Sequence, residues 1–180
     1  MLISYREYTE PTKLVPTHLP DEVYGQCILA FQKVCVDVLL VNISRRVIYL
    51  ARRVIEPAKG WWWFIGGRVN AGEDYVLAAA RHIKTDTSLD LSKERFVGPV
   101  AFHHYTFSTR QEEPQDIGCD TPVLAFLLEL DDAEIDMASS RLNSDEYDST
   151  LGLRAFMRKG LVAEGVHQAI VDIYDQIFPV

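Results

Sequence analysis

The sequence has few cysteines, no long apolar run and no excess of basic residues, and each absence excludes a class of protein. Its three cysteines, Cys27, Cys35 and Cys119, are odd in number and contain no CxxC pair. A disulfide framework or a structural zinc site is therefore not expected. No stretch approaches the roughly 20 apolar residues that span a bilayer. The first residues carry charges and form no apolar run of signal-peptide length, so we expect a cytoplasmic protein with no membrane partner.

The balance of charge argues against nucleic acid as a partner. The formal net charge is −8, from 26 acidic and 18 basic residues, so there is no general excess of positive charge to neutralise phosphates. An anionic small molecule would instead need a local cluster of arginines. The candidates for that cluster are Arg45, Arg46, Arg52, Arg53 and Arg68.

Length and periodicity predict one α/β domain over residues 1–180. The chain has 180 residues and 48% hydrophobic content, which is ample for one core. The predicted strands are residues 33–42, 47–52, 61–65, 94–107 and 122–130, and the predicted helices lie within 17–33 and over 74–87 and 162–178. Polar residues 108–120 predict a surface loop, and the acidic segment 131–148 is expected to be irregular. This order of elements predicts a mixed sheet packed between helices.

The most informative pattern starts at the end of the predicted strand 61–65. Gly67 is followed after five residues by Glu73, and Glu73 after seven by Arg81, in a loop that leads into an apolar-faced helix. This spacing resembles the first half of the Nudix box. The resemblance implies a Nudix-type α/β fold, a mixed sheet sandwiched between helices, and hydrolysis of a nucleoside diphosphate linked to another group. It also implies structural roles for Gly67, Glu73 and Arg81, with Glu73 capping the helix or pairing with Arg81.

The second half of the box departs from the family. His82, Thr85 and Asp86 stand where the family has glutamates, and their spacing places them on one helix face. Imidazole, hydroxyl and one short carboxylate suit Mg²⁺ less well than three glutamates, and His82 with Asp86 would suit Mn²⁺. The resemblance therefore implies Mg²⁺ or Mn²⁺ as cofactor, bound by Gly66, His82 and Asp86. The competing interpretation makes Asp86 a solvated acid and His82 a surface residue.

Residues 33–107 resemble one subfamily more closely, the GDP-mannose mannosyl hydrolases. Their box also keeps only the last carboxylate, where Asp86 lies. The resemblance gives Arg53 and Arg68 the role of neutralising the diphosphate, and Asp37 matches an aspartate in the early strand. Arg53, Arg68 and Asp37 are thus the expected catalytic and substrate-binding residues. Asp37 also lies in an apolar strand, where a carboxylate is costly unless it is paired. The resemblance further implies a homodimer, and GDP and free sugar as products.

Two departures weaken that resemblance. Ile65 replaces the usual proline before Gly-Gly, and Asn143-Ser144 replaces the Gln-His pair that supplies a metal ligand and the general base. A serine hydroxyl is not basic near neutral pH, which leaves His103 and His104 as alternatives. The first hypothesis is therefore a metal-dependent nucleoside-diphosphate-sugar hydrolase. The second is a Nudix-fold binding or regulatory domain without catalysis, and an ordinary pyrophosphatase attacking phosphorus is the least favoured.

Overall fold

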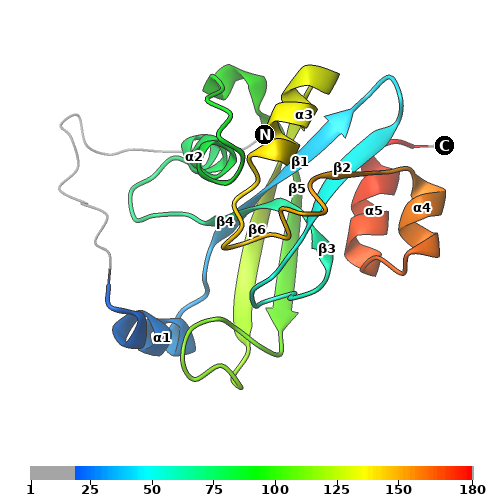
Figure 1. The fold of residues 1–180 in the computed structure, drawn as a ribbon. Helices are drawn as coiled ribbons and strands as arrows, with labels where there is room; N and C mark the ends of the chain where they lie inside the picture. The colour runs from blue at the N-terminus through cyan, green and yellow to red at the C-terminus, as the bar shows by residue number, and fades with distance from the viewer. Residues whose placement is uncertain (1–18, 180) are drawn as a thin grey trace.

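The computed structural model describes residues 19–179, which are built around a seven-stranded mixed sheet (Figure 1). Its strands are β1 (Cys35–Asn42), β2 (Val47–Arg52), β3 (Trp62–Trp63), β4 (Ile65–Arg68), β5 (Val97–Phe107), β6 (Cys119–Glu129) and β7 (Arg154–Phe156). The main order is β3-β2-β1-β6-β5, with β4 beside β1 and β7 beside β2. β1 and β6 are parallel and the other pairs are antiparallel. The predicted mixed sheet is therefore confirmed.

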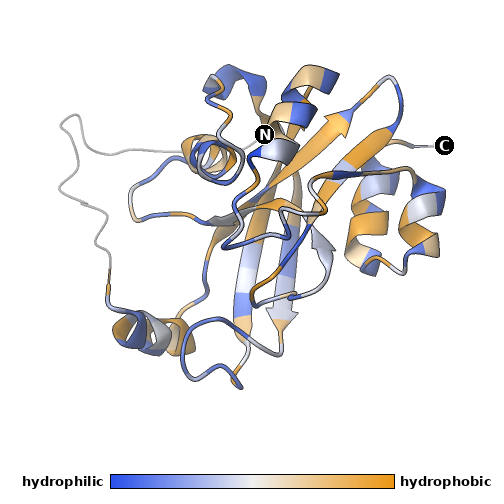
Figure 2. Ribbon diagram, viewed as in Figure 1, coloured by the Kyte–Doolittle hydropathy of each residue, from blue (hydrophilic) through white to orange (hydrophobic). Residues whose placement is uncertain are grey.

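Helices cover both faces of this sheet, as the sequence predicted. They are α1 (Asp21–Ala30), α2 (Tyr75–Thr87), α3 (Asp132–Ser140), α4 (Arg158–Ala163) and α5 (Gln168–Ile177), with a short 3₁₀ turn η1 (Lys93–Arg95). Side chains of β1 alternate between two apolar clusters, one shared with α2 and α3 and the other with α4 and α5. This explains why β1 is largely apolar apart from Asp37 and Asn42, since both of its faces are buried (Figure 2).

Helix α2 has nearly the bounds that its apolar spacing predicts. Its buried face includes Ala79 and Ile83, which pack in the apolar cluster that α2 and α3 share with β1. The N-cap is Asp74, whose side chain accepts a hydrogen bond from the Val76 amide. The expectation that Glu73 caps the helix is therefore wrong, because the chain enters the helix one residue later.

Several segments differ from the prediction. The predicted strand 94–107 begins later, because residues 93–95 form η1 and β5 starts at Val97. The acidic segment 131–148 contains α3, whose start is stabilised by a reciprocal capping box between Asp131 and Glu134. Within the predicted helix 162–178, α4 ends at Ala163 and α5 begins only at Gln168, with Gly165 in the left-handed region between them. The predicted strand 61–65 is likewise two strands, since β3 pairs with β2 whereas β4 pairs with β1. The capping box and Gly165 are local signals, whereas tertiary pairing divides the aromatic strand.

The structure describes only part of the N-terminal region. The predicted helix within 17–33 is found as α1, whereas the charged first residues lie outside the described part of the chain. Among residues 19–179, no helix combines the length and the apolar character needed to cross a membrane.

Pairing between distant segments assembles one end of the sheet. In the β1–β4 register, Gly66 lies opposite Asp37 and Arg68 opposite Cys35. An isolated bridge joins Arg53 to Tyr147. The main-chain N–H of Asn143 donates to the main-chain carbonyl of Asp86 at 2.8 Å. The segment after α3 is therefore held against both β2 and the end of α2.

Candidate functional site

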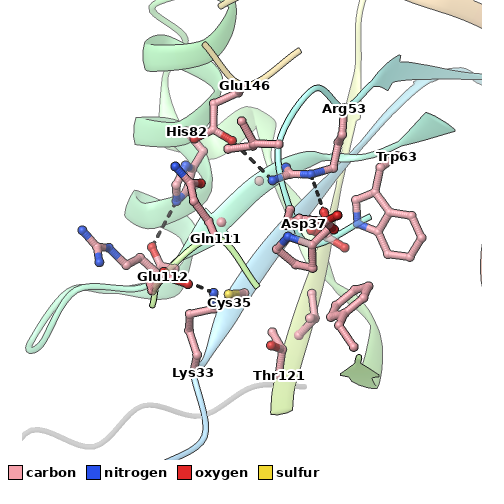
Figure 3. Close-up of a pocket in the computed structure, with 18 of the residues that line it drawn as sticks. Lys33, Cys35, Asp37, Arg53, Trp63, His82, Gln111, Glu112, Thr121 and Glu146 are labelled. Carbon is pink, nitrogen blue, oxygen red and sulfur yellow. Dashed lines mark hydrogen bonds and ion pairs between the residues drawn. The ribbon is translucent and has the colours of Figure 1, made fainter. Parts of the chain in front are cut away.

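A cleft of about 680 Å³ opens where β1 and β4 meet α1, α2 and the loop of residues 108–118 (Figure 3). Among the residues that line it are Asp37, Arg53, Gly66, Gly67, Arg68, Arg81, His82 and Asp86. The structure thus gathers every predicted catalytic, substrate-binding and metal-binding residue around one cavity. Glu73 is the one box residue outside this lining.

Glu73 and Arg81 form an ion pair that fastens the loop before α2 to the helix. Arg81 Nε and Nη2 donate to the two Glu73 carboxylate oxygens, both at 2.7 Å. Although burial acts in the opposite direction, the hydrogen bond from Arg81 holds the pKa of Glu73 below its usual value. The second Glu73 oxygen also accepts from the Asn70 amide at 2.9 Å, and Arg81 donates to the Arg68 carbonyl at 3.0 Å. This network holds the main chain of the loop that forms one wall of the cleft.

His82 packs against the glycine of the box instead of projecting into solvent. Its Nε2 lies 3.0 Å from the Arg68 carbonyl oxygen, and burial lowers the pKa of the ring. The neutral imidazole therefore donates its Nε2 proton to that carbonyl, which leaves a lone pair on Nδ1. Nδ1 lies 3.9 Å from Asp86 Oδ2. A Cβ on Gly67 would approach the His82 Cε1 to 2.6 Å, so the absence of a side chain there makes room for the ring.

Asp86 is a buried carboxylate at the other end of this helix face. Burial raises its pKa to about 6, while a hydrogen bond from Asn143 acts to lower it. That bond runs from Asn143 Nδ2 to Asp86 Oδ1 at 3.3 Å. The interpretation of Asp86 as a solvated acid is wrong, because its side chain is only 6% exposed.

Asp37 and Arg53 are charged groups on the opposite wall. Burial raises the pKa of Asp37 to about 7, and the nearby Arg53 guanidinium partly opposes this shift. Asp37 Oδ2 has no hydrogen-bond partner among residues 19–179. Arg53 donates from Nε to the Pro57 carbonyl at 2.9 Å, and its Nη2 lies 3.4 Å from Glu146 Oε2. A buried, unpaired carboxylate beside a fixed guanidinium is an arrangement typical of functional sites.

The arginine cluster expected from the sequence is smaller than predicted. Arg68 lines the cleft, with its guanidinium 4.5 Å from the centre of the Tyr24 ring. Arg45 instead pairs with Asp132, and Arg46 donates to carbonyls at the chain's C-terminal end. Arg52 donates to the Gly60 carbonyl. Those three arginines lie on β2 or the turn before it and point away from the site, whereas the turn after β2 directs Arg53 into it.

Ser144, at the position of the subfamily's base, and the alternative bases His103 and His104 do not line the cleft. Ser144 is exposed beside Asn143. His104 pairs with Asp120 on the outside of the sheet, and His103 stacks against Tyr105. Neither imidazole of β5 belongs to the cleft lining.

Sequence reasoning missed many residues of the lining, among them Tyr24, Lys33, Glu112 and Glu146. These four come from α1, the segment before β1, the loop 108–118 and the segment after α3. No spacing in the sequence connects these segments, because each reaches the cleft only through tertiary packing.

Comparison with known proteins identifies the family of the chain. The sequence profile of the NUDIX domain matches residues 32–156, which is well over half of the chain. The chain belongs to the Nudix family. A comparison with curated proteins finds no match. Its mixed sheet and helices are those of a Nudix hydrolase, as the sequence predicted.

Solved Nudix structures share this fold at low identity. The MutT NUDIX hydrolase from Burkholderia pseudomallei has a TM-score of 0.59 at 16% identity, covering 81% of this chain and 98% of its own. The dihydroneopterin triphosphate pyrophosphohydrolase of E. coli has a TM-score of 0.54 at 14% identity, covering 81% and 95%. A NUDIX hydrolase from Nitrosomonas europaea has a TM-score of 0.54 at 14% identity, covering 82% and 88%. The shared property is the fold.

Nudix hydrolases generally use divalent metals such as Mg²⁺ or Mn²⁺, and the oxygen donors of this cleft fit such an ion. Among residues 19–179, no three His, Cys, Asp or Glu side chains are grouped to hold a metal by themselves. The cleft does offer the Asp86 and Glu146 carboxylates and the Asn143 amide, with the Gly66 backbone beside them. Mg²⁺ typically takes one or two carboxylates and completes its shell with waters and substrate phosphates. The donor set therefore fits a cation that binds together with a diphosphate.

Proposed function

We propose that this Nudix domain is a metal-dependent hydrolase of a nucleoside-diphosphate sugar, similar to GDP-mannose mannosyl hydrolase, with GDP and free sugar as products. The observation that carries the proposal is that Arg53, Arg68, Asp37 and Asp86 all line one cleft. Two guanidiniums suit a diphosphate, because each can donate paired hydrogen bonds to phosphate oxygens. A buried carboxylate on each wall leaves acidic groups for the metal and for the reacting end of the substrate.

In this proposal the diphosphate lies between Arg53 and Arg68. Asp86, the Gly66 backbone and Asn143 would hold the cation, and His82 would complete the metal site through its free Nδ1. The bound cation supplies positive charge that stabilises the departing diphosphate. Water attacks the anomeric carbon as the carbon–oxygen bond to phosphate breaks, and the electron pair leaves with the diphosphate. The proton of the attacking water must pass to a base in the cleft.

Asp37 is the carboxylate that we give this role. It takes the place of the base that Ser144 cannot provide, because its Oδ2 is unpaired within the described residues and it lines the cleft. Arg53 lies close enough to interact with the Asp37 charge and is itself fixed by Pro57 and Glu146. The pair can therefore keep its geometry while substrate binds.

A second candidate is a Nudix-fold domain that binds a nucleotide or sugar nucleotide in a regulatory role without hydrolysing it. What favours it is the absence, among residues 19–179, of a metal-binding group of three acidic or histidine side chains. The exposed Ser144 at the position of the subfamily's base points the same way. The guanidiniums of the cleft are compatible with both candidates.

The decisive experiment measures hydrolysis of a panel of nucleoside-diphosphate sugars with Mg²⁺ and then Mn²⁺, with identification of the products. In an enzyme, Asp86→Asn should lower turnover about 100-fold or more. In a domain that binds the nucleotide without metal, the same change should leave binding nearly unchanged. Asp90→Asn is the matched control, because Asp90 is exposed on the surface and, within residues 19–179, pairs with Lys84 alone. GDP and free sugar as products support the first candidate. Binding without turnover in either metal supports the second, and turnover that survives Asp86→Asn removes Asp86 from the metal site.

We also propose that two copies of the chain form a homodimer through β5. This strand is one edge of the sheet among the described residues and contains no Asp, Glu, Lys or Arg. Val97 and Phe102 on it are 58% and 67% exposed. An uncharged, exposed edge can pair with the same edge of a second copy, which would satisfy its main-chain groups.

A further inference from the structure

The loop of residues 108–118 is folded around one buried arginine. Arg110 is fully buried, and its guanidinium donates to the carbonyl oxygens of Glu112, Glu113 and Pro114 at 2.9–3.0 Å. Helix α1 packs on the outside of the same loop so closely that a Cβ on Gly25 would meet the Glu113 carbonyl oxygen. The prediction of a surface loop is therefore correct in sequence position, but the loop is fixed from inside and outside.

This folding directs the Glu112 side chain into the cleft. Glu112 lines the cavity and is 18% exposed at its side chain. One carboxylate oxygen lies 3.8 Å from Lys33 Nζ, a long ion pair that Figure 3 shows at the end of the cleft away from Glu146. The other oxygen, Oε2, is buried and has no hydrogen-bond partner among residues 19–179. A buried acceptor without a donor is costly, so a ligand with a hydrogen-bond donor would gain by binding beside it.

The chemistry of this end of the cleft differs from that of the diphosphate region. A phosphate has only acceptor oxygens and negative charge at neutral pH, so it cannot satisfy Glu112. A sugar hydroxyl is neutral, donates one hydrogen bond and accepts others. Such a hydroxyl can donate to Glu112 while it accepts from Lys33, since the two groups lie too far apart to satisfy each other fully.

We propose that Glu112 and Lys33 form the part of the cleft that recognises hydroxyl groups of the sugar, and that Glu112 determines specificity for a sugar-linked diphosphate over the free nucleoside diphosphate. This inference rests on the proposed function, because it places the sugar end of that ligand. Arg110 acts as a positioning residue, since it sets the loop geometry without reaching the cleft lining.

The test is calorimetric binding of two ligand pairs, GDP-mannose with GDP and ADP-ribose with ADP, in metal-free buffer so that no turnover occurs. Glu112→Gln and Glu112→Ala are compared with the wild-type chain and with Asp116→Asn. Asp116 is an exposed acid of the same loop that does not line the cleft, so its substitution removes equal charge without touching the ligand. Thermal melting of each variant shows whether the loop change has altered the fold.

For the ligand pair that binds, we expect both Glu112 variants to weaken the sugar-linked ligand about tenfold to hundredfold, the loss of a charge-assisted hydrogen bond. Binding of the free diphosphate should stay within about twofold, and Asp116→Asn should change neither. Equal weakening of both ligands, or no weakening of either, overturns the assignment of Glu112. If neither pair binds to the wild-type chain in metal-free buffer or with Mg²⁺ added, the proposed function itself fails and this inference with it. A further outcome is that the Glu112 variants weaken only the sugar-linked ligand while the wild-type chain hydrolyses neither ligand after metal is added. That result would retain the inference and favour the binding domain.

Discussion

Gly67→Ala tests the contact between the box glycine and His82. A methyl group on residue 67 would lie 2.6 Å from His82 Cε1, about 1 Å inside the normal separation of carbon atoms. The ring cannot swing aside freely, because its Nε2 is bonded to the Arg68 carbonyl at 3.0 Å. Overpacking of this kind costs about 1–3 kcal/mol, so the substitution should lower the free energy of unfolding by that amount. Removing the ring as well should make room for the methyl group.

The assay is a double-mutant cycle measured by urea unfolding of the wild type, Gly67→Ala, His82→Ala and the double variant. In the His82→Ala background, Gly67→Ala should cost less than about 0.5 kcal/mol, the usual error of additivity. Gly66→Ala is the control, since its methyl group would meet the Val36 carbonyl oxygen of the main chain, which no change at residue 82 relieves. Equal costs of Gly67→Ala in both backgrounds would refute the reasoning that the two groups are in contact.

Three further predictions concern charge, the loop and assembly. Burial raises the pKa of Asp37 from 3.8 to about 7, so the folded chain holds a proton that the unfolded chain releases. The unfolding free energy should therefore fall as pH rises from about 4 to about 7, and Asp37→Asn should flatten this slope in urea titrations. Arg110→Met should lower the unfolding free energy by roughly 2 kcal/mol or more in urea, because three carbonyl oxygens lose their donor. Phe102→Lys should shift the chain from dimer to monomer in light scattering after size exclusion, without changing its melting temperature much.

Each of these predictions has an outcome that contradicts it. An unchanged pH slope in Asp37→Asn would mean that Asp37 is ionised in the folded state at low pH. Because burial raises the pKa of Asp86 to about 6, a smaller slope of the same sign remains in this variant. A melting curve for Arg110→Met that matches the wild type would show that the loop does not depend on the guanidinium. A wild-type chain that is monomeric at all concentrations would end the dimer proposal.

Local sequence patterns predicted much of the fold. The apolar spacing of residues 74–87 predicted α2 to within one residue, and the Val- and Leu-rich runs predicted β1 and β2. These predictions succeeded because helical and strand periodicities are properties of neighbouring residues. Helix α3 was missed although Asp131 and Glu134 form a capping box, because the acidic composition masked that local signal.

The spacing from Gly67 to Arg81 also located the site, since it places a loop and a helix face beside the end of β1. It could not show that His82 turns back to the Arg68 carbonyl, nor that Arg45 and Arg46 bind elsewhere. The direction of a side chain depends on neighbours that lie far away in sequence.

By itself, the sequence determined the order of the main elements, because these follow from composition and periodicity, and its resemblance to the Nudix box indicated the family and the residues of the box. Only the tertiary structure decided which groups share the cleft. The Arg53–Tyr147 bridge brings Glu146 to Arg53, and the loop held by Arg110 brings Glu112 to Lys33. These contacts join residues that lie many positions apart in the sequence. They depend on the packing of the whole core, and no local sequence pattern encodes that packing.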